Sequence, residues 1–499
     1  MSNILKIKDF VCLSKIFLSY KFLVVSTLFI LSCIQSWYLY LQISEFSWFG
    51  CDDLITLTLV SKKSISEFIT ALGSGVNLFP PFYFFLAFFL LEILEIKKNV
   101  LLWIHIPMLW LSIFLCYSLF RTFLSSQFSL LSTVVIATIK SAFLTQCIYV
   151  RPYCLYYCAA LATTFSVIKF LNYSNKSNFI IYWISFQILS LTHYYGLLFG
   201  IIISIPLLFI EFSFIKRFWL LVITLIPTIF VYSYFLPKQM NYMLFSGTHG
   251  GTSFYHIFNH YIVLSFSSLV LFLTITIISF IVSRKFKFSF KTKIPYSLFL
   301  LGVSPLLINF FLYLFFEEGT YYRYFIPAQV GIVSIFVWLS ITFIPLPSVK
   351  FSNTFTFVFS VLLIATWSLR NFHQNDNTNN DFYTGAMEFE YSSLLNSEIP
   401  FYTSHLPTFL KMIHHPDWNS QTNLLRTDDV DFIELPKFSK ILTPNSLLDL
   451  LDLKQFIYHY YYSGPHSNID FKPKKWAFEN GFNTTVLNHY PLVIRFNRI

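Results

Sequence analysis

The stretch Phe46-Ser-Trp-Phe-Gly-Cys-Asp-Asp-Leu-Ile55 decides how the rest of the chain is interpreted. It directly follows the first long apolar segment and contains the adjacent acids Asp52 and Asp53. Carboxylates at the edge of an apolar body are costly unless water or a partner reaches them. Two ordinary explanations stay open, namely that both acids are solvated in a loop or that one caps a helix beginning near Leu54. The remaining explanation is a functional acidic pair.

The composition is that of a polytopic membrane protein. Of the 499 residues, 56% are hydrophobic and 12% are charged, which is about half the charged fraction of a typical soluble domain. The 62 Phe and 31 Tyr residues suit lipid-facing surfaces and interfacial aromatic belts. The net charge of +10 comes mostly from Lys and Arg in loops. This pattern predicts orientation in a membrane and not nucleic-acid binding.

Long apolar segments follow one another through the first three quarters of the chain. The N-terminal lysines precede the first one without a small-residue cleavage site, which predicts an uncleaved signal anchor with a cytoplasmic N-terminus. The expected spans are residues 22–43, 101–120, 130–148, 153–171, 179–192, 194–210, 218–236, 261–282, 296–316, 325–344 and 355–369.

The run from Pro81 to Ile96 decides the topology. It has about sixteen residues, fewer than the about twenty that span a bilayer. If it lies in the interface instead, most basic loops fall on the cytoplasmic side, as the positive-inside tendency requires. The outward exceptions are Arg151, Lys238 and Arg323. We therefore predict an all-α polytopic protein of about eleven transmembrane helices in the plasma or inner membrane.

The composition changes after the last apolar segment. We expect a transmembrane domain over 1–370, whose first extracytoplasmic loop, 44–100, contains interfacial helices. A polar linker follows over 371–381. Residues 382–499 are expected to form a small extracytoplasmic α+β domain, with strands at Ile457–Tyr462 and Thr485–Phe496.

Further polar residues gather on the predicted outward face. Each has an ordinary explanation, because Arg beside Tyr can snorkel to the interface and a His can be satisfied there. Their convergence on one face favours a site. They are His105, Arg151, Tyr153, His193, Arg323 and Tyr324, with the Pro80-Pro81 turn and the acidic pair.

The order of these motifs resembles the GT-C superfamily of membrane glycosyltransferases that use a polyprenyl-phosphate sugar. Protein O-mannosyltransferases and aminoarabinose–lipid A transferases are members of that superfamily. The acidic pair after the first span is Asp52-Asp53 here. The later motifs correspond to Phe79-Pro80-Pro81-Phe82-Tyr83, His105-Ile106-Pro107, Tyr149-Val150-Arg151-Pro152-Tyr153, Thr192-His193-Tyr194 and Arg323-Tyr324 with Pro327. The resemblance covers roughly Ile30 to Ile344, and it departs from the family where Phe79 replaces a cationic or imidazole residue and His105 replaces an Arg.

The resemblance implies transfer of a sugar from a polyprenyl-phosphate donor to a lipid, glycan or protein acceptor on the extracytoplasmic face. In such a reaction an acceptor hydroxyl or amine attacks the anomeric carbon and the lipid phosphate leaves. A carboxylate takes the acceptor proton, and direct displacement inverts the anomeric centre. Asp52 corresponds to the first acid of the family pair and is implied as the base. Asp53 is left to orient it, to bind acceptor, or to bind a divalent cation such as Mg²⁺ or Mn²⁺.

The departing phosphate requires fixed cations or hydrogen-bond donors. Arg323 is the first candidate, followed by Arg151 and His105. Lys140 lies inside an apolar span, where it either replaces the cation missing at Phe79 or snorkels to the interface. The residues expected to contact the rest of the substrate are His193, Tyr153 and Tyr324.

Three other interpretations are less consistent with the sequence. A metal site at the adjacent His414 and His415 is not expected, because no third ligand is near. A transporter or flippase of lipid-linked glycans is the alternative function. It would place ionisable residues near the bilayer midplane, often in two related halves, whereas here they gather at the outer edge and no halves repeat. A purely structural membrane scaffold fits the hydrophobicity but would not explain why these motifs occur in this order.

Overall fold

The computed structural model describes a set of helices and strands separated by gaps. The described residues are 20–44, 51–73, 79–95, 104–138, 144, 147–209, 213–246, 294–316, 322–343, 356–369, 401–403, 422–424, 455–460, 482–489 and 492–498. Among the candidate site residues, only the backbone is described for Asp52, Asp53 and Arg323. Lys140, the predicted span 261–282 and the predicted linker 371–381 lie outside the described residues.

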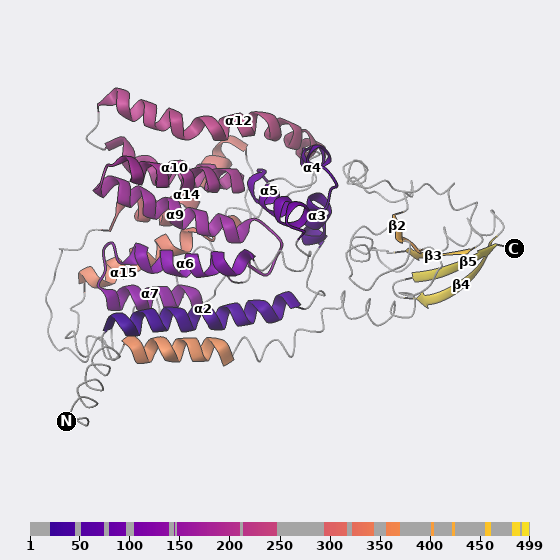
Figure 1. Cartoon of the computed structure of the whole chain (residues 1–499), viewed down its shortest axis with the longest axis horizontal. Coiled ribbons are helices and arrows are strands. Elements are labelled where there is room, and N and C mark those ends of the chain that lie inside the picture. Colours follow the sequence, from indigo (N-terminus) through magenta and orange to yellow (C-terminus); the bar gives the residue numbers. More distant parts are fainter. Residues whose placement is uncertain are drawn as a thin grey trace, which may run out of the picture.

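Roughly parallel and antiparallel helices form the larger part of the described structure (Figure 1). Their sequences are almost wholly apolar, and a helix is the structure in which such a segment satisfies its own backbone hydrogen bonds in lipid. They are α2 (Tyr20–Ser44), α6 (His105–Phe120), α7 (Ser126–Thr138), α9 (Tyr153–Asn172), α10 (Lys176–Thr192), α11 (Tyr194–Ser204), α12 (Phe214–Ser246), α14 (Tyr296–Phe316), α15 (Ala328–Phe343) and the unlabelled orange helix Thr356–Leu369.

The described long helices overlap the spans predicted from the sequence, although α12 continues ten residues past the predicted end at residue 236. Three described segments, Lys21–Leu41, Tyr153–Asn172 and Phe218–Gln239, are long and apolar enough to cross a membrane. The predicted break at Thr192 and His193 is confirmed, because α10 ends at one residue and α11 begins directly after the other. The total number of spans stays a prediction.

Helix α9 lies at the centre of the helical body. Within its most apolar window, 78% of the residues are buried, against 33% for α2 and 22% for α12. It packs against α6, α10, α11 and α14. Large side chains such as Tyr156 and Tyr157 are fully buried on it. Residues of α9 can therefore be reached by side chains from these four helices.

Short helices cover the end of the body at which α2 finishes (Figure 1). They are α3 (Cys51–Val60), α4 (Ile65–Leu72) and α5 (Phe82–Phe88), which continues as the π-helical turn η2 (Phe89–Ile93). The Ser64 side chain caps α4 by accepting a hydrogen bond from the Glu67 backbone N–H at 3.2 Å. Together α5 and η2 are shorter than the about twenty residues that span a bilayer, and the interfacial placement of Pro81–Ile96 stays a prediction.

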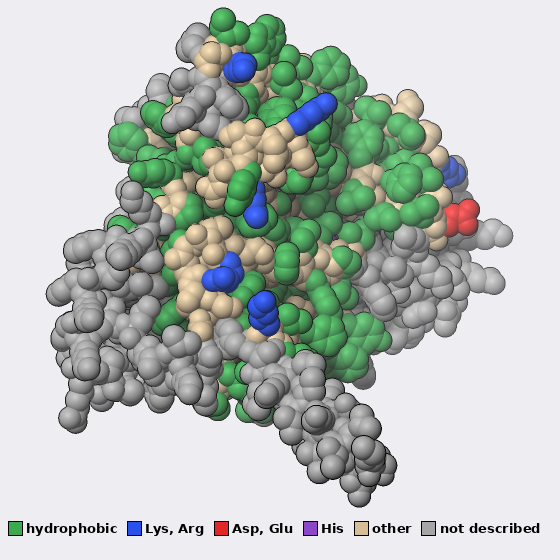
Figure 2. All heavy atoms as spheres, turned by 60° about the vertical axis from the view of Figure 1, so that its left-hand side comes forward, with side chains coloured by type: hydrophobic (Ala, Val, Ile, Leu, Met, Phe, Trp, Pro, Cys, Tyr) green, Lys and Arg blue, Asp and Glu red, His purple; other side chains and the backbone are tan. Residues whose placement is uncertain are grey.

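Exposed basic side chains mark the opposite end of the body, which we call the basic end. Figure 2 shows this face, on which Lys and Arg stand among apolar side chains. The residues that define the basic end are Lys21, Arg121, Lys169, Lys176 and Lys216, all of them exposed. They were predicted to be cytoplasmic or to precede the first span, and the structure places them together.

The α14 and α15 backbones touch at a pair of glycines. A Cβ atom added to Gly331 would lie 2.2 Å from the Gly302 nitrogen and 2.6 Å from its Cα. Real Cβ atoms do not approach backbone that closely. Small residues at a helix crossing allow such contact in membranes, so these helices are fixed against each other.

A five-stranded mixed sheet lies beyond the α3–α5 end in Figure 1. The strands are β1 (Phe401–Thr403), β2 (Thr422–Leu424), β3 (Gln455–Tyr460), β4 (Phe482–His489) and β5 (Leu492–Arg498), in the order β2-β1-β3-β5-β4.

In this sheet β1 pairs in parallel with β2 and β3, and β5 pairs antiparallel with β3 and β4. The segment predicted as one strand, Thr485–Phe496, is instead divided between β4 and β5, with a register shift between Val486 and Asn488. The boundaries of a separate C-terminal domain stay a prediction.

Candidate functional site

His193 lies at the junction of α10 and α11 and fixes the geometry of the site. Its extended backbone, with φ −150° and ψ 138°, interrupts the helical path. The side chain then caps α11, because Nδ1 accepts a hydrogen bond from the Tyr195 backbone N–H at 3.1 Å. In the neutral ring the proton is therefore on Nε2. The side chain is 3% exposed, so the ring is held inside the protein.

Aromatic rings from separate parts of the chain surround His193. The Tyr156 ring stacks on it at a centroid distance of 4.7 Å. The Tyr324 and Phe79 rings lie 4.8 and 5.0 Å from it. We call the whole group the aromatic cluster; it consists of Phe79, Tyr153, Tyr156, His193, Tyr195 and Tyr324.

A hydrogen bond joins the α9 side of the aromatic cluster to the turn before α15. The Tyr156 hydroxyl donates to the Tyr324 carbonyl oxygen at 2.9 Å. Tyr324 lies in the 3-10 turn η5 (Tyr322–Phe325), which also contains Arg323. The backbone of the first candidate for the phosphate site is therefore next to the aromatic cluster.

Arg151 lies against the aromatic cluster. Its side chain is 8% exposed, and the guanidinium carbon Cζ lies 5.4 Å from the centre of the Phe79 ring. A cation over an aromatic face is stabilised by about 1–2 kcal/mol where both are desolvated. Pro152 follows directly and is the N-cap residue of α9, so the start of that helix sets the position of Arg151. Phe79, which replaces the cation of the family motif, thus supports a cation supplied from elsewhere.

His105 is fully buried, and both of its ring nitrogens have protein partners. Nδ1 lies 2.7 Å from the Cys147 carbonyl oxygen, which only accepts, so Nδ1 carries the proton. Nε2 then accepts from the Tyr83 hydroxyl at 3.2 Å. These bonds tie α5 and α6 to the segment that leads to Arg151. The arrangement favours a structural role for His105 over the direct phosphate contact expected from the sequence.

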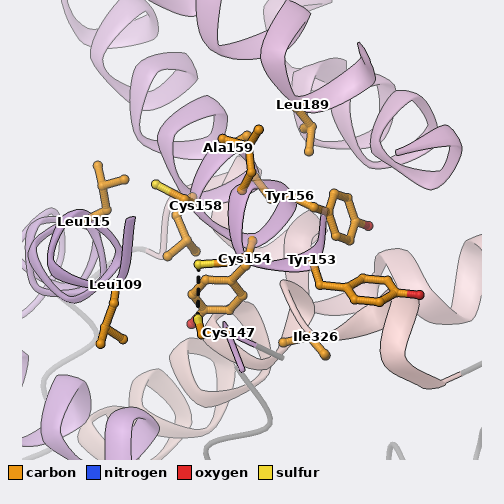
Figure 3. Packing of buried hydrophobic residues seen from close by; sticks show 14 of the residues in the cluster. Leu109, Leu115, Cys147, Tyr153, Cys154, Tyr156, Cys158, Ala159, Leu189 and Ile326 are labelled. Atoms are coloured by element: carbon orange, nitrogen blue, oxygen red, sulfur yellow. Dashed lines mark hydrogen bonds between the residues drawn. The ribbon is translucent and has the colours of Figure 1, made fainter. Parts of the chain in front are cut away.

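A pair of buried thiols lies next to His105, with Cys154 on α9 and Cys147 in the segment before it. Figure 3 shows the Cys147 and Cys154 sulfur atoms in contact, at 3.1 Å, while Tyr153 and Tyr156 project away from them. Both thiols are free. The first turns of α9 therefore have an apolar, thiol-lined side and a separate side that carries tyrosines into the aromatic cluster.

The structure brings together many of the predicted site residues. Arg151, Tyr153, His193 and Tyr324 are all in or against the aromatic cluster.

The acids and Arg323 are placed by their backbone. Asp52 and Asp53 lie in the first turn of α3, which begins at Cys51 and packs against α5. That start excludes the capping of a helix beginning at Leu54, while carboxylates remain favourable in a first helical turn. Among the described residues, no group of three or more His, Cys, Asp or Glu could hold a metal ion.

Several members of the site were not predicted from the sequence. Phe79 was interpreted as the loss of a cation that could contact phosphate, whereas its ring contacts both Arg151 and His193. Tyr156 follows Tyr153 by one helical turn, a spacing that could have indicated a shared face. Tyr195 adjoins the recognised Thr192-His193-Tyr194 motif. Gln239, which lies beside Lys238 just after the predicted apolar span 218–236, was not considered.

The comparisons with known proteins give a clear result for the fold. No protein-family model matches the chain. No curated protein matches it either. Among solved structures, it is similar to the crystal structure of ArnT from Cupriavidus metallidurans bound to undecaprenyl phosphate, with 10% identity and a TM-score of 0.53 over 93% of this chain and 98% of that chain. The apo structure of the same ArnT gives 10% identity and a TM-score of 0.55 over 89% and 92%.

The fold is that of ArnT. The similarity extends over nearly the whole of both chains, so it includes the helical body and reaches beyond it. This fold-level similarity to ArnT agrees with the fold that the order of the motifs implied. At 10% identity the ArnT likeness shows the architecture alone, and the activity must be argued from the residues of this chain.

Proposed function

We propose that this protein is an integral-membrane glycosyltransferase that moves a sugar from a polyprenyl-phosphate donor to a lipid, glycan or protein acceptor. The observation that carries the proposal is the buried Arg151–Phe79–His193 contact within an ArnT-like fold. One structure of that fold is described as bound to undecaprenyl phosphate. A buried cation beside stacked aromatic rings suits a phosphate joined to a sugar, because the cation holds the anion and the rings pack against the sugar.

Each residue of the site has a separate role in an inverting sugar transfer. Asp52 takes the proton of the attacking acceptor, and Asp53 orients it, contacts the acceptor or holds a divalent cation such as Mg²⁺ or Mn²⁺. The new bond forms at the anomeric carbon as the bond to the lipid phosphate breaks. Arg323 and Arg151 balance the charge that develops on the phosphate, with Lys140 as a further candidate. Tyr153, His193 and Tyr324 line the sugar position.

The proposed orientation puts this chemistry outside the cytoplasm. The basic end carries exposed Lys and Arg side chains, and by the positive-inside tendency it faces the cytoplasm. Phe79 of the aromatic cluster lies just before α5, so the cluster is at the α3–α5 end and faces outward in this orientation. The C-terminal sheet lies on the same side (Figure 1). Residues 382–499 would then form an extracytoplasmic domain.

Replacement of the proposed base tests the function. Purified Asp52→Asn protein and the matched Glu67→Gln control, an exposed acid on α4, are compared with labelled polyprenyl-phosphate sugars. Loss of a general base lowers the rate by about 10²–10⁴-fold, so the first variant should bind donor but not transfer sugar, while the control transfers normally. Normal transfer by Asp52→Asn would remove this residue as the base.

The alternative, a flippase for lipid-linked glycans, gives a different result in the same preparation. A flippase reconstituted in vesicles moves labelled lipid between leaflets without releasing polyprenyl phosphate. A glycosyltransferase releases one lipid phosphate for each sugar transferred. Lipid movement without this release would favour the alternative.

A further inference from the structure

We infer that Gln239 is a positioning residue of the proposed donor site. Its side chain holds the Phe79 backbone in a fixed position relative to the start of α11. The inference rests on the proposed function and assigns a residue to it that no motif indicates. Gln239 lies in α12, two residues after the helix-internal Pro237, and is 1% exposed. A primary amide buried in the apolar environment of a membrane protein is costly unless its hydrogen bonds are made.

The Gln239 amide bridges separate segments. Its Nε2 donates to the carbonyl oxygens of Leu72 and Phe79, at 3.2 and 3.3 Å. Its Oε1 accepts from the Tyr194 hydroxyl at 2.6 Å. Carbonyl oxygens only accept and a tyrosine hydroxyl can donate, so the partners themselves fix which way the amide points. One side chain thereby joins the end of α4, the Phe79-Pro80-Pro81 turn and the start of α11.

The carbonyls held in this way lie where the backbone provides few donors of its own. Leu72 is the last residue of α4, whose final carbonyls have no partner within the helix. Phe79 is followed by Pro80 and Pro81, neither of which has a backbone N–H. A donor from another helix is the available solution, and Gln239 supplies it to both carbonyls.

Both ends of the bridge lead into the aromatic cluster. Phe79 contacts the Arg151 guanidinium and the His193 ring, at 5.4 and 5.0 Å. Tyr194 directly follows His193, the residue that caps α11. A shift of the Phe79 backbone relative to α11 would therefore change the face on which Arg151 rests and the distance from that face to His193.

Polar contacts farther along α12 anchor this helix to α10. The Thr228 hydroxyl donates to Gln187 Oε1 at 3.0 Å and lies 2.8 Å from Ser190 Oγ. The Gln187 amide donates to the Thr224 carbonyl at 2.6 Å. Tyr232 donates to the Ser190 carbonyl, also at 2.6 Å. These bonds hold α12 against α10 between Thr224 and Tyr232, before Pro237, and none of them involves Gln239.

The test compares Gln239→Met with Thr228→Val. Gln239→Met keeps the length of the side chain and removes its hydrogen bonds to Leu72, Phe79 and Tyr194. Thr228→Val removes a hydrogen bond between α10 and α12 that lies away from the site. Hydrogen exchange of the peptide covering residues 72–85 should accelerate at least tenfold in Gln239→Met and stay unchanged in Thr228→Val. Binding of undecaprenyl phosphate should weaken in the first variant alone, and sugar transfer should fall with it.

A double-mutant cycle separates positioning from general stability. Tyr194→Phe removes the hydroxyl that Gln239 Oε1 accepts from, so its effect on undecaprenyl phosphate binding should be smaller in the Gln239→Met background than in the wild type. Unchanged exchange of residues 72–85, or unchanged lipid binding in Gln239→Met, would overturn the inference. If the wild type transfers no sugar, the proposed function fails, while exchange and lipid binding still decide the role of Gln239.

Discussion

The two ends of the helical body carry cations in opposite settings. At the basic end, Arg121, Lys169 and their neighbours are exposed to solvent or headgroups. At the other end, Arg151 is buried and rests on the Phe79 ring. An exposed charge is readily replaced, whereas a buried charge depends on each of its neighbours. In the proposed function, one residue type would therefore orient the protein in the membrane at one end and bind the donor phosphate at the other.

Removal of a cation from each end gives the largest expected contrast. Arg151→Gln should lower sugar transfer by about 100-fold, because it removes a preorganised charge from the departing phosphate. Lys169→Gln should leave transfer within about twofold of the wild type. Initial rates at matched amounts of folded protein measure both. Equal rates in the two variants would mean that the ends do not differ in function.

Removal of the aromatic support should have a smaller effect. Phe79→Leu keeps an apolar side chain but removes the ring beneath Arg151, which costs about 1–2 kcal/mol, or about tenfold in donor affinity. Phe79→Tyr keeps the ring and should bind like the wild type. The matched control is Phe89→Leu, at a Phe that is 45% exposed. Undecaprenyl phosphate titrations give the affinities, and tight binding by Phe79→Leu would contradict the cation–π support.

The smallest expected effect is on the free energy of unfolding. It compares one buried hydrogen bond near the site with one part-buried hydrogen bond near the basic end. Tyr83→Phe leaves the buried His105 Nε2 without the hydroxyl it accepts from, so unfolding free energy should fall by about 1 kcal/mol. Tyr117→Phe removes a hydroxyl bonded to Ser126 Oγ at 2.7 Å near the basic end, where the pair is only part-buried. It should therefore cost less. Unfolding midpoints in one detergent provide the measurement, and the reverse order would argue against a structural His105.

The helices and the basic end could be predicted from the sequence, because each depends on composition within one segment. The break at His193 was predictable for the same reason, since a polar residue interrupts two apolar runs. Arg151, Tyr153 and Tyr324 were found as polar or aromatic residues at helix starts.

The rest of the site depends on contacts between segments far apart in the chain. Nothing near Phe79 indicates that Arg151 rests on it, and nothing near Gln239 indicates the carbonyls it binds. Contacts of this kind depend on partners and not on local preferences. The hairpin formed by β4 and β5 is a different error, because Asn488 and Pro491 are residue types that favour a turn and the segment was nevertheless predicted as one strand.

The glycine contact between α14 and α15 has a consequence for how a donor enters. Tyr324 lies in the short turn just before α15, and the α15 backbone packs directly against that of α14. The position of Tyr324 is therefore set by this helix pair. The Phe79 side belongs to a turn between short helices and is tethered through the Gln239 amide. An entering donor therefore meets one side of the site that is held by helix packing and another whose position depends on a single amide, so loss of that amide should displace Phe79 more than Tyr324.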